Sequence, residues 1–192
     1  MRENEIKSLF ICNGYNAMNV AKQYWNMLVR GQESDPDGHG NVFEILDGDK
    51  ISGFSKKNKT EFLSNFHPST ISFEGQLYPT VEHAYQASKT LDIQIRNMIR
   101  KSVSPMDAKK LGRSLTLRDD WVDVRVDIMR QLIREKFQNP FLQHLLLQTD
   151  NLTLINENRW NDKFWGVCKG VGENWLGRIL EEVREEIRND GL

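Results

Sequence analysis

The feature that most constrains the fold is a pair of short hairpin patterns in the first half of the chain. Residues 41–55 alternate around Asp47-Gly48, and residues 70–80 contain a similar turn at Glu74-Gly75. An Asp-Gly pair between alternating residues is a strong signal for a two-residue turn. Two hairpins of this length cannot bury their own apolar faces, so we expect a small antiparallel sheet that lies against helices.

The chain after the second hairpin is predicted to be mostly helical. Thr80 can cap a helix that runs to about Lys101. Ser104-Pro105-Met106-Asp107 is a capping box with proline at the first helical position, and the helix that it begins should end near Gly112.

Three later segments have apolar residues at helical spacing. They are residues 120–138, the stretch that restarts at Asn139-Pro140, and a last helix from about residue 174, on which Arg184 is expected on the outer face. Residues 152–155 are a candidate strand. The expected fold class is therefore α+β, a mainly helical single domain with a small antiparallel sheet.

We interpret residues 1–50 as an N-terminal extension and residues 51–192 as the main domain. The extension contains a predicted helix over residues 16–30, a loop over residues 31–41 and a strand. A chain of 192 residues with 39% hydrophobic content is long enough for one domain with a sizeable core.

Charge and cysteine content narrow the function classes. The net charge of -1 gives no overall attraction to long nucleic acid or to an anionic membrane surface. Cys12 and Cys168 are far apart and have no zinc-spaced partners, which indicates a reducing compartment and no structural metal. We also expect no cofactor. Because no segment approaches the roughly 18 apolar residues of a membrane span, we expect a cytoplasmic protein.

The helix that follows Thr80 carries a first group of chemically useful residues. Glu82, Gln86 and Lys89 share one helical face, with Tyr85 beside them. This face is a candidate pocket wall, and the alternative is a solvated surface with weak side-chain pairs. His83 is a candidate base because its ordinary pKa lies near neutrality, and the alternative for it is an orienting or structural role.

A second group lies in residues 156–177. Glu157 and Asp162 are accompanied there by Trp160, Phe164, Trp165 and Trp175 and by glycines before a helix. Aromatic faces stack on nucleobases, and backbone amides at such a turn can hold phosphate. The alternative is that these tryptophans pack in the core. The glycines match neither a Walker loop nor a dinucleotide fingerprint.

Taken in order, these motifs resemble the NADAR, or YbiA-like, N-glycosidase family. The resemblance covers about residues 51–188 and rests on "FLSNF", "YPTVEHAYQASK", "SPMDAKKLGR", Trp121, "NDKFWGV" and "GENWLGRILEEVREEIR". It implies a YbiA-like domain that cleaves N-glycosidic bonds in ribose-containing metabolites. The implied substrates are ribosylamino-pyrimidine intermediates of riboflavin synthesis or ADP-ribosylated guanine.

The resemblance also assigns site residues. Glu82, Asp162 and Lys89 are the expected catalytic residues, and the expected substrate-binding residues are Asn65, Phe66, Arg113, Trp121 and Trp165, to which we add His83. Cleavage of a ribosyl C1–N bond gives an oxocarbenium-like centre, and the leaving nitrogen needs a proton. We expect Glu82 at the sugar and Asp162 positioning sugar or water, which leaves open which carboxyl protonates the base.

Two questions remain open at the level of sequence. Lys89 either attacks the anomeric carbon or, with Arg113, neutralises a phosphate. The competing function is a non-catalytic reader that binds ADP-ribose, NAD or a related nucleotide with the same groups. Two acidic residues favour catalysis, because carboxylates repel a phosphate ligand. In either case the partner is a small nucleotide or an ADP-ribosylated base, and binding to extended nucleic acid is disfavoured.

Overall fold

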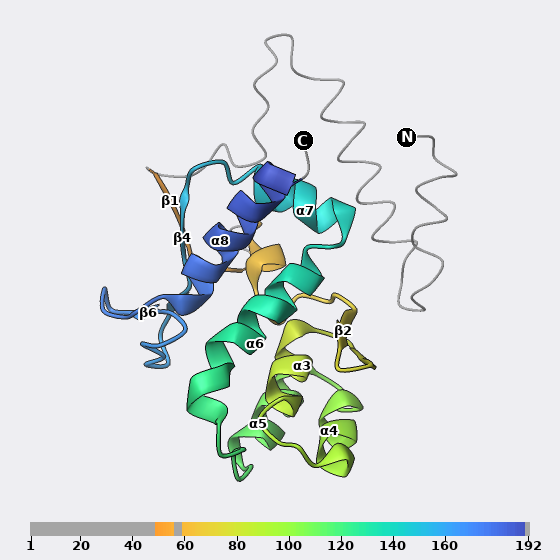
Figure 1. Cartoon of the computed structure of the whole chain (residues 1–192). Helices are drawn as coiled ribbons and strands as arrows, with labels where there is room; N and C mark the ends of the chain where they lie inside the picture. The colour runs from red at the N-terminus through yellow and green to blue at the C-terminus, as the bar shows by residue number, and fades with distance from the viewer. Residues whose placement is uncertain (1–48, 56–58, 191–192) are drawn as a thin grey trace. The chain divides into compact units, whose positions relative to one another are not determined.

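The computed structural model describes residues 49–55 and 59–190, and this part of the chain is mainly helical with small two-stranded sheets (Figure 1). This agrees with the expected α+β class. The predicted helix over 16–30, the loop over 31–41 and the first arm of the Asp47-Gly48 hairpin lie outside the described residues.

Side chains cap several of the described helices at their first turn. The helices are η2 (Glu61–Leu63), α3 (Val81–Ala87), α4 (Ile93–Arg100), α5 (Pro105–Arg113), α6 (Trp121–Lys136), α7 (Pro140–Leu147) and α8 (Trp175–Asp190). The Thr80 side chain accepts a hydrogen bond from His83 N, and Ser104 accepts one from Asp107 N. Asn139 caps α7 in the same way. Local capping chemistry therefore sets these starts.

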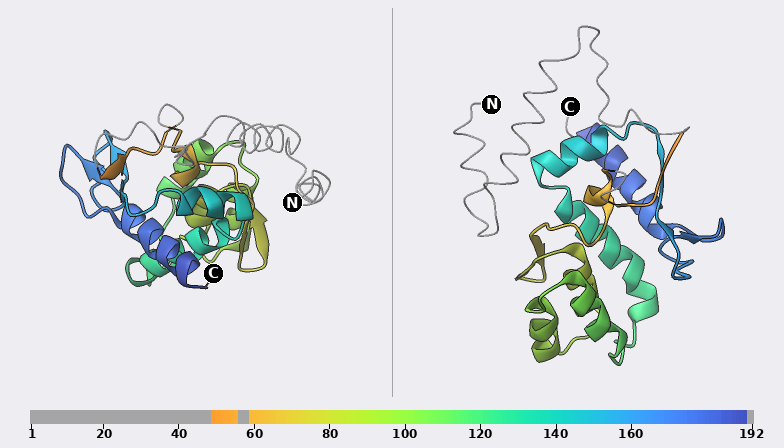
Figure 2. Two further views of the ribbon diagram at one scale, coloured as in Figure 1. Left: turned by 90° about the horizontal axis from the view of Figure 1, so that it is seen from above. Right: turned by 180° about the vertical axis from the view of Figure 1, so that it is seen from behind.

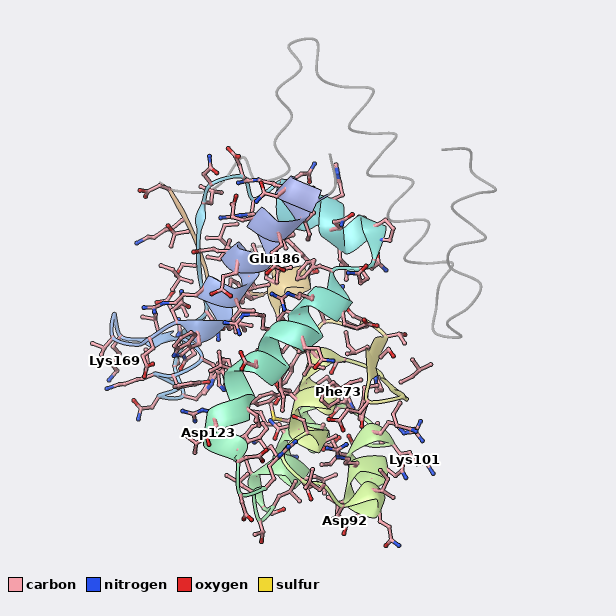
Figure 3. All side chains as sticks on the ribbon, in the orientation of Figure 1. Phe73, Asp92, Lys101, Asp123, Lys169 and Glu186 are labelled. Atoms are coloured by element: carbon pink, nitrogen blue, oxygen red, sulfur yellow. The ribbon has the colours of Figure 1, made fainter. Side chains whose placement is uncertain are left out.

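One predicted helix is wrong, because the segment from Thr80 to Lys101 forms two helices. α3 ends at Ala87, and α4 starts after Asp92, whose Oδ1 accepts hydrogen bonds from the amides of Gln94 and Ile95. Asp92 lies at the N-terminal end of α4 (Figure 3). An aspartate that caps a new helix competes with continuation of the old one. Lys89 consequently stands just beyond the end of α3.

The hairpin at Glu74-Gly75 is confirmed. β2 (Ile71–Phe73) pairs antiparallel with β3 (Gln76–Tyr78). Glu74 and Gly75 have φ angles of 46° and 74°, which is the positive-φ pair that a type I′ turn requires.

The other described strands pair in parallel. β1 (Lys50–Ser52) is the second arm of the predicted Asp47-Gly48 hairpin, and in the structure it pairs with β4 (Thr153–Ile155), the strand expected at residues 152–155. β5 (Glu157–Asn158) pairs with β6 (Val167–Cys168). A parallel partner so far along the chain has no local sequence signal.

The core lies where α6 and α8 pack side by side (Figures 1 and 2). Leu132 and Ile133 of α6 and Ile179 and Leu180 of α8 are fully buried, each stabilising the fold by about 1.5–3 kcal/mol. Arg134 and Glu186 add an ion pair of 2.6 Å at the edge of this contact, and Glu186 is labelled in Figure 3.

Arg184 of α8 corrects a second prediction, because it is buried rather than on the outer face. It is only 4% exposed. Its Nη1 donates to Thr149 Oγ1 at 2.8 Å and to Leu152 O at 3.0 Å, which ties α8 to the segment between α7 and β4. Among the described residues, no helix is long and apolar enough to cross a membrane.

Candidate active site

A cavity of about 950 Å³ opens between α3, α5 and α6 and is completed by residues 61–68 and 156–165. It belongs wholly to the compact unit Ile45–Leu192. Most of the site residues expected from the sequence line it, and these are Asn65, Phe66, Glu82, Lys89, Arg113, Trp121, Asp162 and Trp165. Segments that are far apart along the chain thus meet around one space.

Each of the three helices gives the cavity a stripe of residues spaced three or four apart. α5 contributes Met106, Lys109 and Arg113, and α6 contributes Trp121, Arg125 and Met129. α3 contributes Glu82, Tyr85 and Gln86, and Lys89 follows its end. Such spacing places side chains on one helical face, so the helix axes alone aim them inward. The candidate pocket wall predicted for Glu82, Gln86 and Lys89 is present.

Glu82 is the most enclosed carboxyl group of the cavity, with 5% exposure. Gln86 Nε2 donates to its Oε1 at 2.8 Å, and Glu82 N donates to Asn65 O at 3.0 Å. Burial raises the pKa of Glu82, whereas Lys109, Gln86, Lys89 and Arg113 act in the opposite direction. Glu82 therefore holds its proton to higher pH than an exposed glutamate does.

Lys89 lies close to the aromatic wall. Its Nζ is 5.6 Å from the ring centroid of Tyr85 and 6.0 Å from that of Trp121. Burial lowers the pKa of Lys89, Glu82 opposes this, and Lys109 and Arg113 add to it. Lys89 therefore loses its proton and becomes a neutral amine at lower pH than an exposed lysine does.

The aromatic wall is continuous. Tyr85 packs against Trp121 with ring centroids 5.2 Å apart and edge-on against Trp165 at 5.4 Å. Phe164 meets Trp165 edge-on at 4.9 Å. All four side chains also line the cavity. Their contacts fix a rigid surface on which a planar ring can stack.

Asp162 lines the cavity and also shapes the loop that carries the aromatic residues. Its Oδ1 accepts hydrogen bonds from Trp165 N at 2.9 Å and Phe164 N at 3.2 Å. Asn158 fastens the same loop, since its Oδ1 accepts from Asp162 N at 3.0 Å. Part of the Asp162 carboxylate is thus committed to holding Trp165 in place.

His83 is not among the residues that line the cavity, unlike the other expected site residues. It is 2% exposed. Its Nδ1 is hydrogen-bonded to Thr80 Oγ1 at 2.8 Å, and its Nε2 to Ser102 O at 3.3 Å. Because both ring nitrogens have partners that fasten α3 to the segment before α5, the structure fits the alternative of a structural histidine.

Three charged cavity residues were missed from the sequence: Glu61, Lys109 and Arg125. Lys109 Nζ lies 5.6 Å from the Phe66 ring centroid and 5.8 Å from that of Trp160. Arg125 lies four residues after Trp121 and Lys109 four before Arg113, so helical spacing from predicted residues could have found both.

The cations of the cavity have no carboxylate partner among the described residues, and they are Lys89, Lys109, Arg113 and Arg125. Other cations, outside the cavity, do pair with carboxylates, and these are Arg96, Lys110, Arg118, Arg130, Arg134, Arg184 and Arg188. Cations without carboxylate partners in a cavity are suited to binding phosphate.

Residues 48–188 match the model of the family described as NADAR domain. The "Riboflavin biosynthesis protein" of Vibrio vulnificus is 42% identical over 131 residues, which cover 66% of this chain and 35% of that protein. The "N-glycosidase YbiA" of Escherichia coli is 40% identical over 150 residues, which cover 76% of this chain and 93% of that protein.

The structural comparison agrees with the sequence comparisons. An NMR structure of the E. coli protein YbiA matches with a TM-score of 0.69 and 36% sequence identity. The match covers 78% of this chain and 92% of that one. The described domain and the E. coli protein therefore share one fold over nearly the full length of the latter.

Proposed function

The chain belongs to the NADAR family, and from this premise we propose that it is an N-glycosidase. Its substrate would be a ribose-phosphate or ADP-ribose conjugate, either a ribosylamino-pyrimidine or an ADP-ribosylated guanine, and its reaction the hydrolysis of the ribosyl C1–N bond. Relatives named N-glycosidase support the reaction class. The observation that carries the proposal is the buried Glu82 in a cavity that also holds an aromatic wall and unpaired cations.

Glu82 has the properties that the leaving group requires. The departing nitrogen takes a proton as the C1–N bond breaks, and an acid is most useful when its pKa lies near the working pH. Burial moves the pKa of Glu82 in that direction. Once ionised, the same carboxylate stabilises the positive charge at C1. Asp162 also organises its own loop, and we assign it to positioning the sugar or the water.

The remaining groups of the cavity bind the rest of the substrate. The wall that contains Trp121 and Trp165 offers stacking worth about 1–3 kcal/mol per base. Lys109 and Arg113, which lie one turn apart on α5, are the groups proposed to bind the phosphate.

Lys89 is proposed to attack C1 and to form a Schiff base after the ribose ring opens. The base departs with the proton from Glu82, and water then releases the sugar and restores the amine. Borohydride treatment during turnover is expected to trap a ribosyl adduct on the wild type and none on Lys89→Arg, which keeps the charge. A wild type that turns over without a trapped adduct would assign Lys89 to phosphate instead.

The proposed reaction is tested by following release of the free base by liquid chromatography and mass spectrometry. The purified protein is incubated with NAD, ADP-ribose, a ribosylamino-pyrimidine phosphate or ADP-ribosylated guanosine. Wild type is expected to release a base from at least one, and Glu82→Gln to be slower by about 100-fold or more. Asp123→Asn, which changes an exposed carboxylate on α6 (Figure 3), is the matched control and should retain activity.

Two results would contradict the proposal. No release of base by the wild type, combined with a rise in thermal stability on adding one of these compounds, would identify a non-catalytic reader. Full activity of Glu82→Gln would remove Glu82 from the mechanism.

A further inference from the structure

We propose that Arg125 is a specificity-determining residue that recognises an oxygen acceptor on the leaving base. This inference rests on the proposed N-glycosidase function and deepens it. It concerns a residue that no motif in the sequence singled out, and it divides the cavity into a phosphate end and a base end.

The first observation is that the Arg125 guanidinium lies over the ring of Phe164. Its Cζ lies 3.8 Å from the centroid of the Phe164 ring. At this distance a guanidinium group is stacked on the ring face, and stacking restricts its orientation. Phe164 is itself fixed, because its amide donates to Asp162 Oδ1 and its ring meets Trp165 edge-on.

The second observation is that part of the hydrogen-bonding capacity of Arg125 is unused within the described residues. Its Nε is buried and has no hydrogen-bond partner among them. No carboxylate of a described residue lies within ion-pair distance of its guanidinium, whereas Arg130, one turn and a half further along the same helix, pairs with Asp127 and Glu182. A planar group with five donors and no acceptor opposite it is suited to a ligand.

The third observation is that Arg125 belongs to the aromatic side of the cavity. Lys109 on α5 lies over the rings of Phe66 and Trp160. Arg125 on α6 lies instead over the ring of Phe164, which meets Trp165 edge-on. The cations on α5 and the cation on α6 therefore serve different parts of the ligand.

These observations identify the kind of atom that Arg125 contacts. A base that stacks on Trp121 or Trp165 has its edge beside the rings among which the guanidinium lies. Carbonyl oxygens and ring nitrogens on such an edge are acceptors, and arginine pairs with them through two parallel donors. Phosphate is already served by Lys109 and Arg113. Arg125 is thus assigned to the base carbonyl.

The test compares Arg125→Met with Arg113→Met on whichever substrate the wild type cleaves. Arg125→Met is expected to raise KM and the inhibition constant of the released base by about tenfold or more, which is typical for loss of a bidentate arginine contact. The affinity for ribose 5-phosphate should stay unchanged. Arg113→Met should instead weaken the binding of ribose 5-phosphate and leave the inhibition constant of the released base unchanged. Arg130→Met, which removes a cation that pairs with Asp127 and Glu182, should match the wild type in both constants.

A second measurement begins with the wild type alone, so its first result does not depend on folding of the variants. Titration of the wild type with 5,6-diaminouracil and with 4,5-diaminopyrimidine compares two bases that differ in their carbonyl oxygens. Tighter binding of the uracil is expected, and Arg125→Lys, which keeps the charge but not the planar fork, should lose the preference. Equal binding of both bases by the wild type, or a parallel loss of base and ribose 5-phosphate affinity in Arg125→Met, would overturn the proposal. Absence of any base release by the wild type would instead refute the proposed function.

Discussion

Glu82 and Lys136 are two ionisable side chains that are almost fully buried, at 5% and 1% exposure. Burial raises the pKa of Glu82 and lowers the pKa of Lys136 to about 7. Lys136 Nζ donates to Ser64 O at 2.8 Å, in the turn that brings Asn65 to the cavity. At the scale of single residues, the site is therefore built from groups that cost stability in their charged forms.

Replacement of Glu82 is expected to make the protein inactive and, at neutral pH, more stable. A carboxyl group with a raised folded-state pKa stabilises the fold most below its unfolded pKa, and that contribution is lost as pH rises through the folded pKa. Glu82→Gln should therefore melt at a higher temperature than the wild type at pH 7, and the difference should shrink at pH about 4. A difference that does not change with pH would contradict the buried, ionising glutamate.

Lys136 is expected to give the opposite pH dependence. A lysine with a lowered folded-state pKa contributes stability that is present above its unfolded pKa and lost as pH falls through the folded pKa. Relative to Lys136→Met, the free energy of unfolding of the wild type should therefore rise between pH about 7 and about 10. Urea denaturation across this range measures it, and parallel curves for the two proteins would show that Lys136 does not lose its proton there.

At the scale of elements, the close contact between α3 and α5 keeps Glu82 in place. A Cβ added to Gly112 would lie 1.9 Å from Gln86 Oε1 and 2.9 Å from Gln86 Cβ. Gln86 is the residue that donates to Glu82. Glycine is required at this position because a larger residue would push Gln86 away from the carboxyl group.

Gly112→Ala is expected to destabilise the protein by about 1–3 kcal/mol, the usual cost of overpacking. The hydrogen bond from Gln86 lowers the pKa of Glu82, so its loss should raise that pKa. The profile of rate against pH should therefore move toward higher pH. Arg113 is the next residue, so the control is Ser114→Ala, whose Oγ bonds only Leu111 O. An unchanged pH profile in Gly112→Ala would contradict the link between Gln86 and Glu82.

Helix starts and tight turns could be predicted from the sequence, whereas one helix break and the strand pairing could not. Caps at Thr80 and Ser104, the restart at Asn139-Pro140 and the turn at Glu74-Gly75 were predicted because their signals are local. The break between α3 and α4 was missed, since Asp92 was read as a helical residue rather than a cap. The parallel pairing of β1 with β4 could not be predicted, because the two strands are distant in sequence.

The site residues divide in the same way, into those with a local sequence signal and those that only tertiary packing brings together. The stripe of Glu82, Gln86 and Lys89 follows from helical spacing, and the cavity residues from distant segments came from the family resemblance. Arg125 and Lys109 were missed although helical spacing from Trp121 and Arg113 points to them. Their contacts with Phe164 and Phe66 come from tertiary packing, which the sequence does not show. The hydrogen bond between His83 Nε2 and Ser102 O likewise depends on tertiary packing and has no sequence signal.

At the scale of the whole molecule, the proposed main domain contains the complete described cavity. Ile45–Leu192 is one compact unit, and every described cavity residue lies within it. β1, at Lys50–Ser52, pairs with β4. The family match begins at residue 48.

A chain that begins at Ile45 is therefore expected to fold and to release base at the rate of the full-length protein. Thermal unfolding and the base-release assay measure these two properties. Normal unfolding with lost activity would contradict this expectation and would show that the first 44 residues contribute to the site.

The central claim, hydrolysis of a ribosyl C1–N bond, is tested most directly by turnover in water enriched in the heavy oxygen isotope. Mass spectrometry of both products shows where the oxygen of water goes. We predict a heavy ribose product and a base of unchanged mass, with both signals reduced together in Glu82→Gln. Heavy oxygen in the base, or release of base without incorporation into the sugar, would contradict hydrolysis at this bond.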